Sequence, residues 1–92
     1  MIKIIKFGAS WCAPCKTFEP VFKSIAKEYG DKAIFIEKDI EECEEDAEEY
    51  QIKSIPTLLF LDEKGVAVGR IVGTVSKEIV IETLEELLTN VR

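Results

Sequence analysis

Histidine is absent from this chain of 92 residues. Its absence excludes nucleophilic catalysis by a cysteine–histidine pair, zinc sites that use histidine, and haem attachment through a C-x-x-C-H motif. Long hydrophobic runs are also absent, since the longest apolar stretches, such as IPTLLFL at residues 55–61, are far too short to cross a bilayer. Nothing in the sequence resembles a signal peptide. We therefore expect a cytoplasmic protein without a membrane partner.

Basic charge is scarce as well. The 12 lysine and arginine residues are outnumbered by 18 acidic residues, which gives a net charge of −6, and nine of the acids lie in residues 37–49. A chain without a basic patch is poorly suited to bind nucleic acid, so we expect no such partner. We interpret the acidic segment as a solvated helix face.

Cysteine occurs three times, and this odd number excludes a full disulfide framework. The chain is 47% hydrophobic, an ordinary composition for a globular protein that needs no such staples in a reducing compartment. Because 92 residues is near the lower end of what buries a self-sufficient core, we expect residues 1–92 to form a single domain.

Hydrophobic spacing predicts the secondary structure. Runs rich in branched residues predict strands at residues 2–7, 33–40, 57–61 and 66–72. Apolar residues three and four apart predict a helix at residues 13–29, and a last helix that Ser76 caps. The acidic residues 41–50 are compatible with a further helix between them. The last helix is expected to bury Val80, Leu84, Leu87, Leu88 and Val91.

The resulting order, β-α-β-α-β-β-α, predicts an α/β fold. A β-α-β opening requires parallel strands joined by a right-handed crossover, and the closing hairpin adds an antiparallel half. We expect a small four-stranded mixed sheet with helices on both faces.

The segment SWCAPCKTF at residues 10–18 carries the chemistry. Cys12 lies where the first strand leads into the first helix, and Cys15 follows one turn later. Unpaired N–H groups and the positive end of the helix dipole favour a thiolate at this position. We therefore expect Cys12 to be the exposed nucleophile and Cys15 the more buried, resolving thiol.

Two other interpretations of this motif are weaker. A zinc site needs four ligands, whereas the chain offers one further cysteine, Cys43, and no histidine. A purely structural disulfide between residues this close would close a very short loop and contribute little stability.

Four motifs together resemble the thioredoxin family over essentially all 92 residues: WCAPCK, FEPVF, SIPT, and VG before the last helix. Ala13 stands where the family usually has glycine, and the family's usual first strand and helix are missing, so the chain resembles a minimal, glutaredoxin-sized member. Glutaredoxins typically have tyrosine where Pro14 stands, which favours thioredoxin-like partners over glutathione. The resemblance implies a thioredoxin fold and a monomeric reductase of protein disulfides. Such a protein is recharged by a thioredoxin reductase-type donor and needs no cofactor beyond its own disulfide.

The resemblance also implies a substrate surface. Ile55–Pro56 should be a cis peptide facing the cysteines, so that an extended substrate can pair with the exposed backbone of Ile55. Without the cysteines, Pro56 would be interpreted as an ordinary trans proline at the start of a strand, and Trp11 as a core aromatic lodged at the surface. The expected substrate-binding residues are Trp11, Ala13, Pro14, Ile55, Pro56, Val72 and Gly73.

One departure from the family concerns charge. Thioredoxins usually carry a buried aspartate six residues before the first cysteine, where this chain has Lys6, and commonly a lysine on the neighbouring strand, where it has Glu37. We expect the exchanged charges to pair below the cysteines and to act in proton transfer. Alternatively, Lys6 extends to water and Glu37 belongs to the acidic surface.

Two other functions fit the same residues. A thioredoxin-like binding or processivity subunit would use the apolar rim without turnover. A disulfide oxidase or isomerase would use the cysteines in an oxidising compartment.

Overall fold

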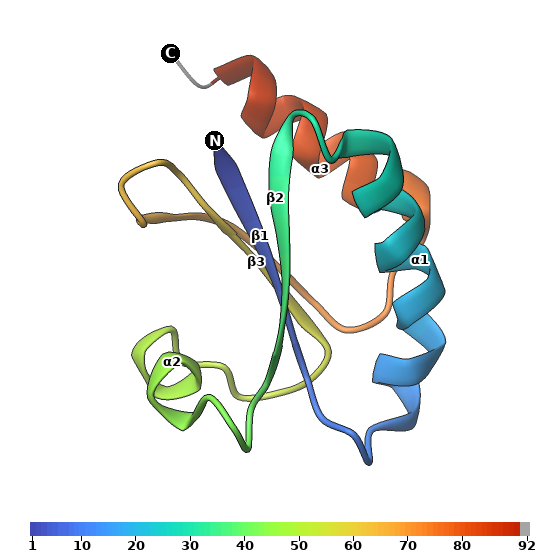
Figure 1. Ribbon diagram of the computed structural model, residues 1–92, viewed down its shortest axis with the longest axis vertical. Helices are drawn as coiled ribbons and strands as arrows, with labels where there is room; N and C mark the ends of the chain where they lie inside the picture. The colour runs from blue at the N-terminus through green and yellow to red at the C-terminus, as the bar shows by residue number, and fades with distance from the viewer. Residues whose placement is uncertain (91–92) are drawn as a thin grey trace.

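The computed structural model describes residues 1–90. The predicted order of strands and helices is confirmed (Figure 1). The elements are β1 (Ile2–Gly8), α1 (Ala13–Tyr29), β2 (Ala33–Asp39), α2 (Glu44–Glu49), β3 (Thr57–Leu61), β4 (Ala67–Val72) and α3 (Lys77–Asn90). Within this part of the chain, every helix is too short or too polar to cross a membrane.

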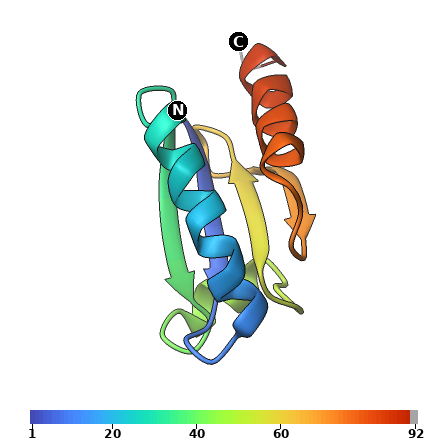
Figure 2. The ribbon, with the colours of Figure 1, turned by 90° about the vertical axis from the view of Figure 1, so that its right-hand side faces the viewer.

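The strands form one four-stranded mixed sheet in the order β2-β1-β3-β4. Strand β1 runs parallel to β2 and antiparallel to β3, and β3 forms the predicted hairpin with β4. Helices α1 and α3 cover one face of the sheet and α2 covers the other (Figures 1 and 2). The predicted thioredoxin fold is thereby confirmed.

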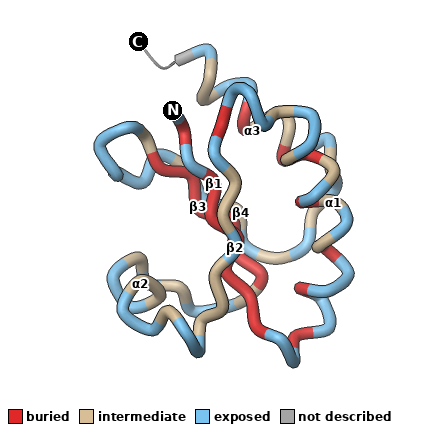
Figure 3. Tube along the Cα trace, in the orientation of Figure 1, coloured by how far each residue is buried: buried red, intermediate tan, exposed pale blue. Residues whose placement is uncertain are grey.

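Each face of the sheet carries its own apolar cluster, and the central strands contribute to both. Figure 3 shows that burial is most continuous along β1 and β3. The larger cluster lies under α1 and α3 and includes Ile2, Ile4, Phe18, Phe22, Ile25, Phe60, Val80 and Leu84. The smaller one, on the side of α2, consists of Ile5, Phe7, Leu59 and Leu61. Because β1 is buried on both faces, its last residues are fixed in position, and they lead directly to the cysteine motif.

Helix α2 is shorter than predicted, because it begins at Glu44 instead of residue 41. Asp39 organises the preceding residues into a turn: its side chain accepts a hydrogen bond from the amide of Glu41, and its carbonyl accepts bonds from the amides of Glu42 and Cys43. An aspartate that binds nearby amides in this way competes with helix formation.

The boundaries of three strands also differ slightly from the prediction. Strand β1 ends at Gly8 and not at residue 7. Strand β2 ends at Asp39 and not at residue 40, and β4 begins at Ala67 because the amide of Val66 binds the side chain of Asp62 in the hairpin turn. Ser76 accepts a hydrogen bond from the amide of Ile79 at the start of α3, as its predicted capping role requires. Val91, expected in the stripe of the last helix, lies outside the described residues.

Candidate functional site

Cys12 and Cys15 form a disulfide at the start of α1, with their Cα atoms 5.3 Å apart. Cys12 is the N-cap of the helix, and its Sγ accepts a hydrogen bond of 3.2 Å from the backbone amide of Cys15. Pro14 stands in the first turn, where a missing N–H removes no helical hydrogen bond. The sulfur of Cys12 therefore lies against the positive end of α1, where a helix favours a thiolate.

The expected exposure of Cys12 is wrong for the disulfide form. Cys12 and Cys15 are both buried, at 5% and 4% exposure. Ala9 completes this small buried cluster, against which Ile40 and Ile55 pack. Apolar neighbours on several sides cover Cys12 as well as Cys15, whereas the spacing of the motif reports only that the two sulfurs share one helix end.

The peptide bond between Ile55 and Pro56 is cis, as the resemblance implies. Ile55 packs against the cluster that contains both cysteines, and Pro56 is buried directly before β3. The carbonyl of Pro56 accepts a hydrogen bond of 2.8 Å from the amide of Gly73, which has φ +91°. The two residues of the cis bond therefore have different contacts: Ile55 packs near the disulfide, and Pro56 is hydrogen-bonded to Gly73 directly after β4.

Exposed apolar side chains lie next to Cys12 and at the end of β4. Trp11 is 64% exposed and Val72 is 56% exposed. The indole N–H of Trp11 donates a hydrogen bond of 2.7 Å to the carboxylate of Glu41. Ala13 and Pro14 are exposed on the first turn of α1. Sequence reasoning missed Glu41, because the dense run of acids gives no signal to distinguish one member.

Lys6 and Glu37 are direct neighbours in the parallel pair of β1 and β2, and their side chains form an ion pair of 3.0 Å. The Lys6 side chain is only 7% exposed, and its Nζ lies 5.7 Å from the centre of the Phe22 ring, whereas Glu37 is 44% exposed. The alternative in which Lys6 extends to water is therefore excluded.

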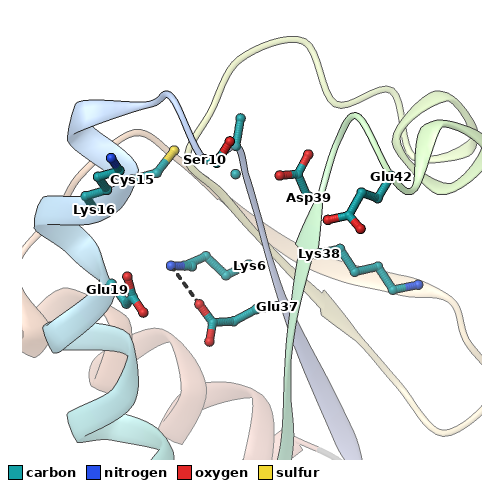
Figure 4. A pocket seen from close by; sticks show the side chains of 11 residues that line it. Lys6, Ser10, Cys15, Lys16, Glu19, Glu37, Lys38, Asp39 and Glu42 are labelled. Carbon is teal, nitrogen blue, oxygen red and sulfur yellow. Dashed lines mark ion pairs between the residues drawn. The ribbon is translucent and has the colours of Figure 1, made fainter.

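An open cavity of about 550 Å³ brings this ion pair and Cys15 together (Figure 4). Lys6 and Glu37 point toward each other from the sheet, while Cys15 and Glu19 face them from α1. Lys23 and, more weakly, Lys6 hold the pKa of the Glu19 carboxyl below its ordinary value. Cys15 thus borders a polar cavity that the Lys6–Glu37 ion pair also lines.

The absence of a side chain at Gly8 allows Cys15 to approach the sheet closely. The sequence placed Gly8 at the end of the first strand and gave no sign of this role. A Cβ atom on Gly8 would lie 3.2 Å from the Sγ of Cys15 and 3.3 Å from its Cβ. Gly8 is two residues beyond Lys6 on the same face of β1. The sulfur therefore occupies the space that a side chain at position 8 would fill, next to the Lys6 side chain.

Replacing Gly8 with alanine should destabilise the oxidised protein by about 1–3 kcal/mol, the usual cost of forcing an extra methyl group into a packed site. Urea unfolding measures this change. Gly69→Ala is the matched control on β4, since its Cβ would come no closer than 3.4 Å to the side chains of Leu87 and Phe60. Equal stability of the two variants would contradict the close packing of Cys15.

Among residues 1–90, no three cysteine or acidic side chains are grouped so that they could hold a metal ion.

Comparisons with known proteins agree with this geometry. The family model for thioredoxin matches residues 1–86. The thioredoxin of Pongo abelii is 38% identical over 85 residues, covering 92% of this chain and 78% of that protein. The thioredoxin of Staphylococcus epidermidis is 37% identical over 87 residues, covering 95% of this chain and 83% of that protein.

Solved structures show the same likeness. The germline-specific thioredoxin Deadhead of Drosophila melanogaster superposes with a TM-score of 0.86 at 30% identity, covering 94% of this chain and 80% of that one. Reduced Schistosoma mansoni thioredoxin superposes with a TM-score of 0.83 at 35% identity, covering 92% of this chain and 77% of that one. With its C-x-x-C disulfide at the start of α1, the chain belongs to the thioredoxin family and is a thiol–disulfide oxidoreductase.

Proposed function

We propose that this protein reduces disulfides in other proteins, with Cys12 as the attacking thiolate and Cys15 as the resolving thiol. The Cys12 sulfur attacks one sulfur of the substrate disulfide, and the other substrate sulfur leaves as a thiolate. Cys15 then loses its proton and attacks Cys12, which closes the Cys12–Cys15 disulfide and releases the second substrate sulfur. Two electrons pass to the substrate, and two protons accompany them.

The observation that carries this assignment is the position of the disulfide at the start of α1. Cys12 is the N-cap and accepts a hydrogen bond from the Cys15 amide. When the disulfide is reduced, the same N–H group and the helix dipole favour a negative charge on Cys12. Cys15 lies one turn inside the helix and borders the cavity below, so a substrate that approaches over Trp11 meets Cys12 first.

The substrate is an extended segment of a protein that carries a disulfide. It lies across the exposed rim formed by Trp11, Ala13, Pro14, Val72 and Gly73, and its backbone pairs with that of Ile55 before the cis proline Pro56. Such pairing supplies affinity without a demand for a particular sequence.

Lys6 and Glu37 assist the step in which Cys15 acts. The Lys6 ammonium is buried beside the cavity that Cys15 borders, so its field favours a thiolate at this sulfur. Glu37 is paired with Lys6 and 44% exposed, so it can take a proton from the cavity, through water, and release it to solvent. Stabilising the reduced form makes the disulfide easier to reduce, and therefore raises its potential.

The electron donor is a reductase of the thioredoxin reductase type. A redox titration against dithiothreitol or glutathione distinguishes a reductase from an oxidase, because thioredoxin has a potential of about −270 mV and the oxidase DsbA about −120 mV. We expect a single two-electron transition somewhat above the value for thioredoxin. A potential close to that of DsbA would contradict the proposed direction of electron flow.

Cys43 is expected to be dispensable for this reaction. It is a free, half-buried cysteine before α2, where its side chain makes no capping hydrogen bond. Cys43→Ser should therefore leave the rate of disulfide reduction within about twofold, since surface changes away from the site have small effects. Loss of turnover in this variant would mean that the chemistry does not belong to Cys12 and Cys15 alone.

A further inference from the structure

Arg70 connects the edge strand β4 to the end of α2. Its Nη2 donates a hydrogen bond of 2.5 Å to the carbonyl of Tyr50, and its Nη1 donates one of 3.2 Å to the carbonyl of Gln51. One guanidinium thus holds two successive carbonyls about 20 residues away in the sequence. Sequence reasoning missed this contact, because an arginine on an exposed strand carries no signal for a distant partner.

The end of α2 has a particular need for such a donor. The last carbonyls of a helix have no partner within the helix, and they form the negative end of its dipole. Helix α2 has only six residues, with acids in its first turn and no basic residue in its last turn. Arg70, on strand β4, supplies the positive charge that the last turn of α2 lacks.

The backbone immediately after α2 is also unusual. Among residues 1–90, Gln51 is the only residue other than glycine with a positive φ, at 53°. A side chain in the left-handed region persists where its surroundings hold it. The amide of Ile52 donates to the carbonyl of Ala47, and Arg70 fixes the carbonyl of Gln51 itself.

Strand β4 and Gly73, the residue directly after it, hold both ends of the loop formed by residues 50–56. Arg70 binds the carbonyls at its start, and the amide of Gly73 binds the carbonyl of Pro56 at its end. Between these anchors, Gln51, Lys53 and Ser54 are exposed. Ile52 and Ile55 are half-buried against the apolar clusters, and the hydroxyl of Thr57 donates a hydrogen bond to the carbonyl of Ser54. The position of the Ile55 backbone therefore depends on the two anchors together with this packing.

We propose that Arg70 is a positioning residue for the reduction of protein disulfides: from β4 it holds the loop of residues 50–56 so that the Ile55 backbone keeps its place beside the Cys12–Cys15 disulfide. This inference rests on the proposed function, in which a substrate strand pairs with that backbone. A loop released at its start would have to become ordered each time a substrate binds, which weakens binding. The sulfur chemistry itself does not involve Arg70.

The test compares two substrates that differ in size. Arg70→Met keeps the aliphatic stem and removes the donors, and Arg70→Lys restores the charge. For insulin, Arg70→Met should raise KM about fivefold, the effect of losing hydrogen bonds worth about 1 kcal/mol, with kcat nearly unchanged. The reaction with 5,5′-dithiobis(2-nitrobenzoate), a small disulfide without a peptide strand, should keep its rate. Arg70→Lys should recover part of the loss.

Lys77→Met is the matched control. Lys77 binds Ser24 and pairs with Glu28, and thereby joins α3 to α1 away from the loop. This variant loses a comparable surface contact and should keep the wild-type KM for insulin. An unchanged KM in Arg70→Met, or an equal rise in both variants, would overturn the proposal.

Amide hydrogen exchange in the oxidised protein provides a readout that does not depend on activity. The amides of Tyr50, Gln51 and Ile52 donate to the carbonyls of Asp46, Glu48 and Ala47. They should exchange several-fold faster in Arg70→Met than in the wild type, and at the wild-type rate in Lys77→Met. If Arg70→Met does not fold, the same measurement on Arg70→Gln, which lacks the charge and the forked donors, decides the question. Unchanged exchange would overturn the positioning role, whereas a wild-type protein that reduces neither disulfide would contradict the proposed function instead.

Discussion

Cys15→Ser should convert the protein into a trap that remains covalently attached to its substrates. In this variant Cys12 can still attack a disulfide, but no second thiol is available to resolve the mixed disulfide. Cys12→Ser should form no such adduct, because the sulfur that the α1 N-terminus favours as a thiolate is lost. Both variants should lose essentially all catalytic turnover.

The measurement is mass spectrometry of each variant after reaction with a protein disulfide, followed by mapping of the cross-linked peptide. Both variants should also carry Cys43→Ser, so that the remaining free cysteine cannot contribute. We expect an adduct at Cys12 in the variant without Cys15 and none in the variant without Cys12. An adduct at Cys15 as abundant as that at Cys12 would reverse the assigned roles.

Exchange of charge at Lys6 should have the second largest effect. Lys6→Asp places a buried carboxylate beside Glu37. The attractive ion pair, with its N···O distance of 3.0 Å, is thereby replaced by repulsion between two carboxylates. Removing one partner of a fully buried pair costs about 3–5 kcal/mol, and because Glu37 is 44% exposed we expect about 2–4 kcal/mol for this pair. Urea unfolding measures the loss. Lys3→Asp, at an exposed position on the same strand, is the control and should change stability little.

The redox potential should respond as well. Lys6→Asp replaces a positive charge near Cys15 with a negative one, which disfavours the thiolate and lowers the potential, by roughly 30 mV for each 1.4 kcal/mol. Glu37→Lys should also lose stability, and both single variants should lose activity. The double variant Lys6→Asp/Glu37→Lys should recover both stability and activity. A double-mutant cycle with purely additive effects would show that the pair is not coupled.

The part of the site closest to the sequence motif was the most predictable. The branched residues of β1 and the apolar stripe of α1 place Cys12 at a helix start from spacing alone, because both elements are set by local periodicity. Pairing of Lys6 with Glu37 was expected from the family resemblance, in which these two positions carry the opposite charges on neighbouring strands. The cis bond before Pro56 came only from the family resemblance, since local sequence favours trans.

Features that depend on contacts distant in the sequence could not be predicted. The exposure of Cys12 is set by Ile40 and Ile55, which pack against the disulfide from two other segments. The start of α2 is set by the hydrogen bonds of Asp39, and charge spacing in the acidic segment contains no trace of them. The anchor at Arg70 likewise depends on a contact across the fold that no local pattern encodes.

The most direct test of disulfide reduction by this protein is the reduction of insulin with NADPH and a thioredoxin reductase as the electron source. The protein should reduce many equivalents of insulin disulfide, with NADPH consumed in proportion, and Cys12→Ser should abolish the reaction. The contrary result is a wild-type protein that binds partner proteins but does not reduce insulin, whether the donor is NADPH with the reductase or dithiothreitol. That result would identify a binding subunit and contradict the proposed function as a reductase.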